Sequence, residues 1–178
     1  MKPPHLPPVN LHWQLLPYHS SLRVIGKPQL LFDIAVPISQ MRFAADPYPR
    51  PLRNRDLDKP AADDEQLDEM TIECECLPEK LIHVTRARGI RCRDVFDKVY
   101  CAYNRVLDAK ERAKIRPKEM VRVQEAFKIR CAESPGLTEY EAYQGLRCVD
   151  RLQGKTYFLG LTRPSSDSNW VLHLGNKP

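Results

Sequence analysis

The sequence lacks any long hydrophobic run. Nothing in its 178 residues approaches the ~18 consecutive apolar residues that span a bilayer, so we expect no transmembrane helix and no membrane partner. The first 18 residues hold one lysine but no unbroken apolar core, because prolines interrupt them, and this argues against a secretory signal. We therefore expect a protein of the cytoplasm or the nucleus.

The sequence also lacks the motifs of common catalytic and nucleotide sites. It contains no nucleophile elbow, no H-E-x-x-H helix and no G-x-G-x-x-G turn. Gly154, Lys155 and Thr156 resemble the end of a phosphate loop, but Val149 stands where that loop needs its first glycine. We assign no catalytic residue and no cofactor, and leave open whether the chain is an enzyme.

The six cysteines include no C-x-x-C pair. In a chain that is not exported, thiols stay reduced, so we expect free cysteines. Cys74 and Cys76 in the stretch MTIECECL share the parity of Met70 and Ile72, as one face of a strand requires. We predict that both cysteines fill the buried face of a strand as small hydrophobes and bind no metal.

Proline and charge divide the chain unevenly. Residues 1–69 hold 11 of the 16 prolines and carry 8 Lys/Arg against 9 Asp/Glu, a net charge of −1. Residues 70–178 carry 20 against 14, so the positive excess belongs to this part. We predict a proline-rich extension over residues 1–28, which forms a strap. A single domain follows over 29–175, with a long loop at 39–69.

Hydrophobic spacing predicts the elements of this domain. Strand-like runs lie at 29–38, 70–77 and 80–92, and two more at 156–163 and 169–175 form a hairpin. Helical spacing predicts helices over 93–107 and 118–134, which a charged connector joins. A short helix follows, with Thr138 and Glu141 as a capping box at its start and Gly145 at its end. This order predicts an α+β fold: an antiparallel sheet of about five strands with two main helices packed on one face.

Basic residues are the remaining candidates for a binding site. Four arginines lie within eight positions around one turn, and residues 105–130 carry a local charge of +5. Arginines at a loop tip can bind phosphate or carboxylate groups bidentately. The alternative is a solvated surface, since acidic residues interleave the basic ones, and no nucleic-acid-binding motif accompanies the charge. Nucleic-acid binding is therefore a minority hypothesis.

The region after Arg93 resembles a known family. The stretches RDVFDKVY, VQEAFKIRC and YQGLRCVDRLQGKTYFLGLTRPSSDSNWVLHL are similar to the fungal domain-of-unknown-function 6699 family. The similarity rests on Gly145, Val149–Asp150, Gly154–Thr156, Gly160–Leu161 and Trp170, whereas Arg151 stands where the family more often has an apolar residue. The resemblance covers about residues 29–175. It implies a small α+β domain in a fungal, intracellular setting, and no reaction.

We expect a non-catalytic binding or interaction domain whose partner is a protein or a small anionic ligand. It would use the open face of the sheet, the arginine turn and the 39–69 loop. The candidate binding residues are Arg86, Arg88, Arg91, Arg93, Tyr157, Trp170 and His173. The alternative is a small enzyme or small-molecule binder with a pocket between sheet and helices, lined by Tyr100, Tyr103, Tyr157, Trp170 and His173.

Overall fold

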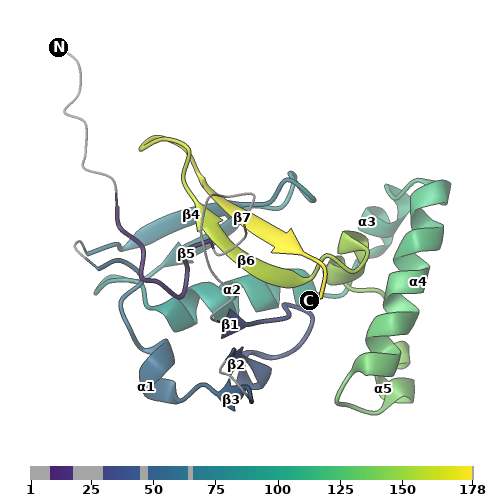
Figure 1. The fold of residues 1–178 in the computed structure, drawn as a ribbon. Helices are drawn as coiled ribbons and strands as arrows, with labels where there is room; N and C mark the ends of the chain where they lie inside the picture. Colours follow the sequence, from purple (N-terminus) through teal and green to yellow (C-terminus); the bar gives the residue numbers. More distant parts are fainter. Residues whose placement is uncertain (1–8, 18–29, 45–47, 64–65, 178) are drawn as a thin grey trace.

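The computed structural model describes residues 9–17, 30–44, 48–63 and 66–177. The fold is α+β, as predicted, but its strands form two sheets (Figure 1). The larger sheet has the order β5-β4-β7-β6, from the strands Glu69–Glu73 (β4), Ile82–Thr85 (β5), Tyr157–Thr162 (β6) and Trp170–Gly175 (β7). Strands β4 and β7 run parallel, and the other neighbours are antiparallel, so the sheet is mixed.

The smaller sheet occupies the region that we expected to be a strand and a long loop. It joins Leu30–Leu31 (β1), Arg42–Phe43 (β2) and Arg50–Pro51 (β3), and is accompanied by the helical turns Ile38–Gln40 (η2) and Asn54–Leu57 (α1). The predicted strand 29–38 is partly confirmed. Beyond Leu31, residues 32–34 pair with β6, where the Phe158 N–H donates to the Phe32 carbonyl and the Ile34 N–H to the Thr156 carbonyl, both at 2.9 Å. The pairing ends there, because the Asp33 carboxylate accepts a 2.9 Å bond from the Ala35 backbone N–H and the chain turns.

Helix α2 (Cys92–Asn104) forms the core with the larger sheet. It follows the predicted helical spacing and buries Val95, Phe96, Val99 and Tyr103. The Phe96 ring meets Phe32 and Phe158 edge-on, at centroid distances of 5.3 and 5.4 Å. This aromatic cluster joins the helix, the small sheet and β6 into one core.

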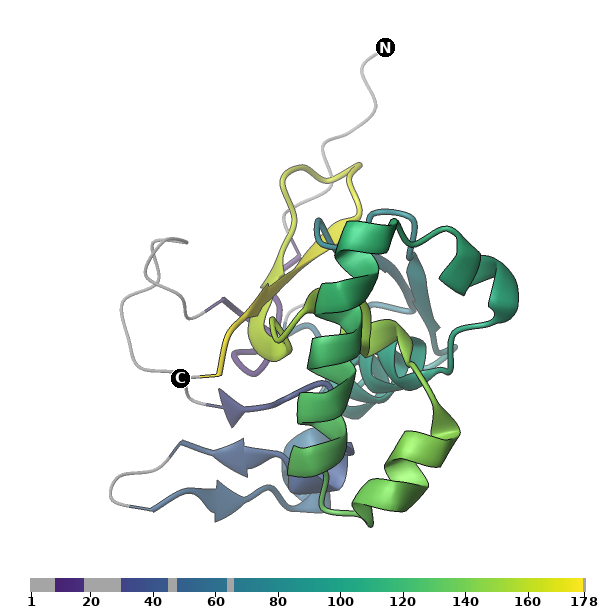
Figure 2. The ribbon, with the colours of Figure 1, turned by 90° about the vertical axis from the view of Figure 1, so that its right-hand side faces the viewer.

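Helix α4 (Pro117–Glu133) begins at Pro117 as predicted, but it does not pack on the sheet as expected. It packs mainly on helix α5 (Thr138–Gln144) and the 3₁₀ turn η3 (Cys148–Leu152), to one side of the sheet (Figures 1 and 2). The predicted charged connector before α4 instead forms a short helix, α3 (Ala109–Ala113), which begins with a capping box between Asp108 and Glu111.

The N-terminal segment 9–17 packs on the domain at two places: residues 10–12 pair with residues 61–63, and Leu15 meets the edge of β6. The Leu161 backbone N–H donates to the Leu15 carbonyl over 2.8 Å. Gly160 has φ +114°, and a Cβ there would stand 2.3 Å from the Pro17 Cα. Only glycine allows this approach, so part of the predicted strap packs on the domain. The rest of residues 1–28 lies outside the described residues.

Candidate functional site: a cleft along helix α4

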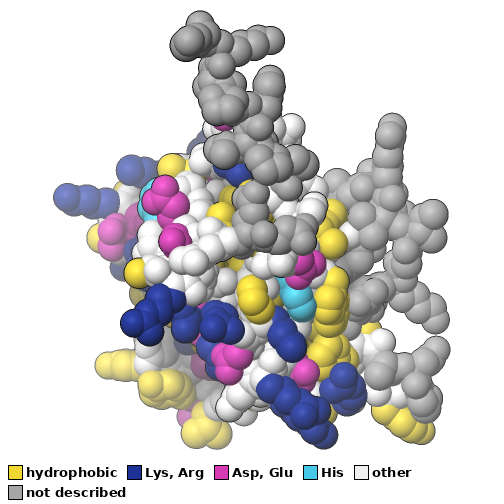
Figure 3. All heavy atoms as spheres, turned by 90° about the vertical axis from the view of Figure 1, so that its left-hand side faces the viewer, with side chains coloured by type: hydrophobic (Ala, Val, Ile, Leu, Met, Phe, Trp, Pro, Cys, Tyr) yellow, Lys and Arg dark blue, Asp and Glu magenta, His cyan; other side chains and the backbone are white. Residues whose placement is uncertain are grey.

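The arginine turn that we predicted as a binding site is mostly occupied by internal contacts. Arg86 contacts Asp94 at 2.9 Å, Arg91 donates to the Asp58 carbonyl at 2.6 Å, and Arg93 contacts the Asp58 carboxylate at 3.1 Å. These bonds tie the 54–58 segment and the turn after β5 to the start of α2. Arg88 is exposed at the turn. Figure 3 shows one face of the molecule on which basic and acidic side chains interleave.

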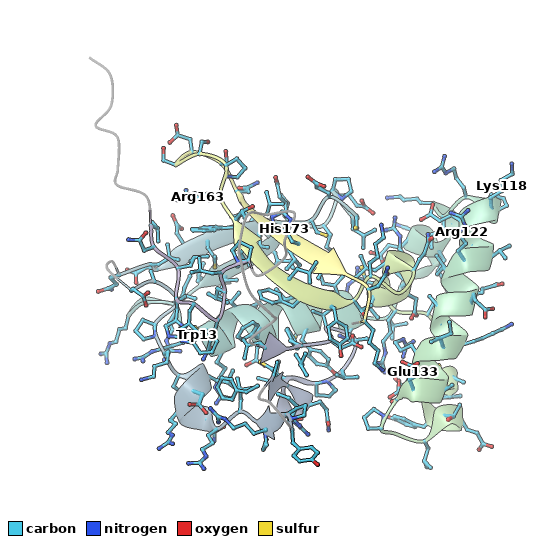
Figure 4. The ribbon with its side chains drawn as sticks, in the orientation of Figure 1. Trp13, Lys118, Arg122, Glu133, Arg163 and His173 are labelled. Atoms are coloured by element: carbon cyan, nitrogen blue, oxygen red, sulfur yellow. The ribbon has the colours of Figure 1, made fainter. Side chains whose placement is uncertain are left out.

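The predicted binding residues Tyr157, Trp170 and His173 are not brought together. Trp170 is 5% exposed and belongs to the core, with the Arg163 guanidinium 5.3 Å from its ring centre. His173 lies on β7, where its Nε2 is 2.7 Å from the Thr162 hydroxyl, away from α4 (Figure 4). Only Tyr157 lines the cleft described below. His83 likewise contacts a threonine, Thr71, on the neighbouring strand.

The prediction for the cysteine pair is half correct. Cys74 is 2% exposed, but Cys76 is exposed, because β4 ends at Glu73 and a turn follows. All six cysteines are free thiols. Within the described residues, no group of three or more His, Cys, Asp or Glu side chains is placed to hold a metal ion.

A cleft of about 960 Å³, which we call the α4 cleft, runs along α4. One wall is a single face of α4, with side chains spaced at three to four residues: Arg122, Glu125, Ala126, Ile129, Arg130 and Glu133. The opposite wall comes from the segment after β1 and from β6, with Asp33, Ala35, Val36, Pro37, Thr156 and Tyr157. The lining also includes Tyr100 of α2, the η3 region, Arg42 and Lys177.

A buried ionic network holds the α4 side of this cleft. Arg130 donates to Asp150 from Nε at 2.7 Å and from Nη2 at 3.1 Å, and it contacts Glu141 at 3.1 Å. Arg147 contacts the same Glu141 oxygen at 2.8 Å. The Asp150 side chain is 1% exposed and that of Arg130 8%, so the pair is desolvated. Burial alone would lower the pKa of Arg130, but its hydrogen bonds to Asp150 raise it.

The capping box that we predicted for α5 is wrong, because Glu141 belongs to the ionic network around Arg130. Leu137, not Thr138, precedes the helix, and no side chain caps it. Glu141 instead turns inward to Arg130 and Arg147. Gly145 does end the helix, with φ 84°, and its carbonyl accepts from Arg130 Nη2 at 3.3 Å.

Two tyrosines mark chemically different sides of the cleft. Burial raises the pKa of Tyr157, and the nearby Asp33 and Glu133 carboxylates raise it further. Burial also raises the pKa of Tyr100, whereas the neighbouring Arg147 lowers it. Both hydroxyls are therefore neutral hydrogen-bonding groups at pH 7. Tyr100 is thus influenced by both the Arg147 guanidinium and the Glu141 carboxylate, and Tyr157 by the Asp33 and Glu133 carboxylates.

Charge also changes along α4 itself. Lys118 and Arg122 lie at its N-terminal end and Glu133 at its C-terminal end (Figure 4). A second hollow, lined by Arg116, Lys118, Glu119, Arg122 and Gln153, adjoins the cleft, and Arg122 and Gln153 line both. The cleft thus has a basic end at the N-terminus of α4 and a part lined by Ala126 and Ile129, whereas at the C-terminal end Glu133 is paired at 3.7 Å with Lys177, which also lines the cleft. Sequence reasoning identified the local positive charge but could not tell which face of α4 was uncovered.

Comparison with known proteins places the chain in one family. The model of the Family of unknown function (DUF6699) matches residues 30–169, which include the smaller sheet, strands β4, β5 and β6 of the larger sheet, all five helices and nearly all of the cleft lining. No curated protein and no solved structure matches. None of the helices in the described part of the chain combines the length and apolar character that crossing a bilayer needs.

Proposed function

The chain belongs to this family of unknown function, DUF6699, and we propose that it is a binding domain that takes a short extended peptide of a partner protein into the α4 cleft. The observation that carries the proposal is the uncovered face of α4. Ile129 is 50% exposed there, between charged residues and opposite apolar residues of the segment after β1. An apolar wall with a few oriented polar groups is typical of a ligand site.

The length of this wall fits a peptide. From Arg122 to Glu133 the helix advances about 16 Å at ~1.5 Å per residue. An extended peptide covers that distance with about five residues at ~3.3 Å each. A central apolar side chain would lie on Ala126 and Ile129.

Charge complementarity orients the peptide. Arg116, Lys118 and Arg122 gather at the N-terminal end of α4, where the helix dipole adds partial positive charge. We therefore expect acidic residues of the peptide at this end and neutral residues near Glu133, because Lys177 already pairs with Glu133 at 3.7 Å. The Arg130–Asp150 pair keeps the wall in place before binding, which lowers the cost of ordering the site.

A selection of peptides from a random display library tests the proposal. We expect peptides with an apolar centre and an acidic flank. Their affinity should fall at least tenfold for Ile129→Glu, which puts a charge into the apolar middle. Val121→Glu is the matched control, because Val121 is an exposed apolar residue of the same helix that does not line the cleft. Peptides that bind both variants as well as the wild type would refute the site.

A charge reversal tests the orientation separately. Arg122→Glu should weaken acidic peptides about tenfold and relieve the preference for an acidic flank. Lys128→Glu should change little, because Lys128 is an exposed basic residue of α4 outside the cleft. Equal losses in both variants would mean that general surface charge, rather than the cleft, attracts the peptide.

Binding of a small molecule is the alternative function, since two residues of the predicted pocket, Tyr100 and Tyr157, line the cleft. Its length and the uncovered helix face favour a peptide. Steep salt dependence of retention on DNA, unaffected by Ile129→Glu, would instead favour nucleic-acid binding. The fungal setting and the cytoplasmic or nuclear location remain proposals that rest on the family resemblance and the free thiols.

A further inference from the structure

The turn that ends β4 carries a cysteine pair that the proposed function does not use. Residues 74–77 form a turn in which the Leu77 N–H donates to the Cys74 carbonyl over 3.0 Å. Cys74 is the first residue of this turn and is buried at 2% exposure, while Cys76 is the third and is exposed. Cys76 is therefore accessible to solvent and Cys74 is not, and the Cys74 thiol hydrogen-bonds to the backbone and the side chain of Cys76.

A buried hydroxyl lies beside the same thiols. Tyr103 of α2 is fully buried, and the Cys74 thiol neighbours its hydroxyl. Burial raises the pKa of Tyr103, and the Cys74, Cys148 and Cys76 thiols raise it further.

The turn brings the two cysteines within disulfide reach. In a strand, alternate residues stand ~6.6 Å apart along the chain and their side chains are held parallel. A turn folds its first and fourth residues to within ~7 Å of each other and brings its third residue closer to the first than a strand does. Disulfides need a Cα separation of ~4.4–6.8 Å. The predicted continuous strand would have opposed this bond, and the observed turn permits it.

We propose that Cys74 and Cys76 are an oxidation site, where hydrogen peroxide converts the two thiols into a reversible intramolecular disulfide. The exposed Cys76 thiolate attacks one peroxide oxygen, the O–O bond breaks, and hydroxide leaves and takes up a proton as water. The sulfenic acid on Cys76 is then attacked by the Cys74 sulfur, the S–O bond breaks, and a second water leaves. Two thiols are oxidised and one peroxide is reduced to two waters.

The pair is suited to this order of events. Burial raises the pKa of the Cys74 thiol, so Cys74 is protected from direct attack by oxidants and reacts only with the sulfur beside it. Cys101 is also exposed, but it lies on α2 and is not part of a closely spaced cysteine pair. It provides a matched control for an exposed cysteine without a partner.

Peptide mapping of the oxidised protein tests the proposal. The reduced full-length chain is treated with hydrogen peroxide, free thiols are alkylated, and the peptides are identified by mass spectrometry. We expect two of the six thiols to be lost, the peptide with Cys74 and Cys76 to be two hydrogen atoms lighter, and dithiothreitol to restore both. Cys101→Ser should leave this result unchanged, and Cys76→Ser should abolish it.

Three outcomes would overturn the proposal. The first is a disulfide that persists in Cys76→Ser, which would show that Cys74 pairs with Cys148. The second is oxidation of Cys76 in the wild type to sulfinic acid without loss of the Cys74 thiol. The third is a disulfide-linked dimer. Because Cys76 is exposed and outside the strand, its replacement should not alter the fold, and an unchanged circular dichroism spectrum checks this.

Discussion

Helices α2 and α4 differ in the fraction of their residues that is buried. Five of the 13 residues of α2 are buried, among them Phe96 and Tyr103, whereas only two of the 17 residues of α4 are buried, Val123 and Cys131. Helix α2 is held by apolar surface against a sheet. Helix α4 depends to a larger extent on the ionic link from Arg130 to Asp150. Its uncovered face is the face that lines the cleft.

The comparison shows how a small domain keeps a binding surface. Apolar burial removes a helix face from water and leaves nothing for a partner. A buried ion pair fixes a helix at one point and leaves the adjoining face uncovered. A buried ion pair requires a defined geometry, and the free energy of removing both charges from water offsets much of its attraction. The helix that it holds should therefore be the less stable part of the fold.

The largest expected effect is in the core of α2. Phe96→Ala removes the ring that meets Phe32 and Phe158, and should lower the free energy of unfolding by about 4 kcal/mol through lost burial and a cavity. Phe127→Ala on α4 is the matched variant, and should cost only about 1 kcal/mol because Phe127 is half-buried. Urea denaturation measures both. Equal losses would contradict the contrast between the helices.

The second effect is local to α4. Arg130→Ala leaves the Asp150 carboxylate buried and without its guanidinium partner, which should cost about 3 kcal/mol. Hydrogen exchange should accelerate in α4 and α5 while the amides of α2 stay protected.

Arg105→Ala is the control for Arg130→Ala. Arg105 also pairs with a carboxylate, Glu111, but their side chains are 44% and 28% exposed. Its removal should cost less than about 1 kcal/mol. If hydrogen exchange accelerates equally in α2 and α4 in the Arg130→Ala variant, the two helices unfold as one cooperative unit. The Arg130–Asp150 pair then does not stabilise α4 locally.

The smallest effect is on the pH dependence of the α2 region. Burial raises the pKa of Cys92 to about 12, and the Asp63 and Asp94 carboxylates act in the same direction. Its thiol also donates to the Pro60 carbonyl at 3.6 Å. The unfolded chain loses this proton near pH ~8.5, so the stabilisation is complete below that pH and is lost as the pH rises toward the folded-state value.

The expected loss is up to about 1.4 kcal/mol per pH unit above pH ~8.5. Urea denaturation between pH ~8 and ~10 measures this slope. Cys92→Ala should be less stable at neutral pH but should show a shallower alkaline slope. Cys101→Ser should keep the wild-type slope, because Cys101 is exposed. A slope unchanged by Cys92→Ala would mean that other buried groups, such as Tyr103, dominate.

Much of the fold was predictable where one periodicity persists over several turns or a hairpin closes locally. The apolar stripe of α2, Pro117 at the start of α4, Gly145 at the end of α5 and the β6–β7 hairpin all follow from short-range rules. Predictions failed where a side chain found a distant or competing partner. Asp33 shortened the first strand, and Glu141 left its expected cap for Arg130.

The candidate site was less predictable than the fold. Four clustered arginines suggested a surface for anions, but three of them bind acidic or carbonyl groups that lie up to 35 residues away in sequence. Tyr100 and Tyr157 were expected to line a pocket between sheet and helices, and they do line the α4 cleft, whereas Tyr103 and Trp170 are core residues. Spacing alone cannot distinguish the two cases, because it identifies which residues share a face and not what covers that face.

The sequence by itself determined the α+β class, the helix stripes and the hairpin, since each depends on backbone propensity and neighbours within a few residues. Only the tertiary structure decided that strand β4 stops before Cys76, that the arginine turn is internally paired and that one face of α4 is uncovered. These features depend on contacts between residues far apart in the chain, whose formation is governed by competition for burial and for charged partners.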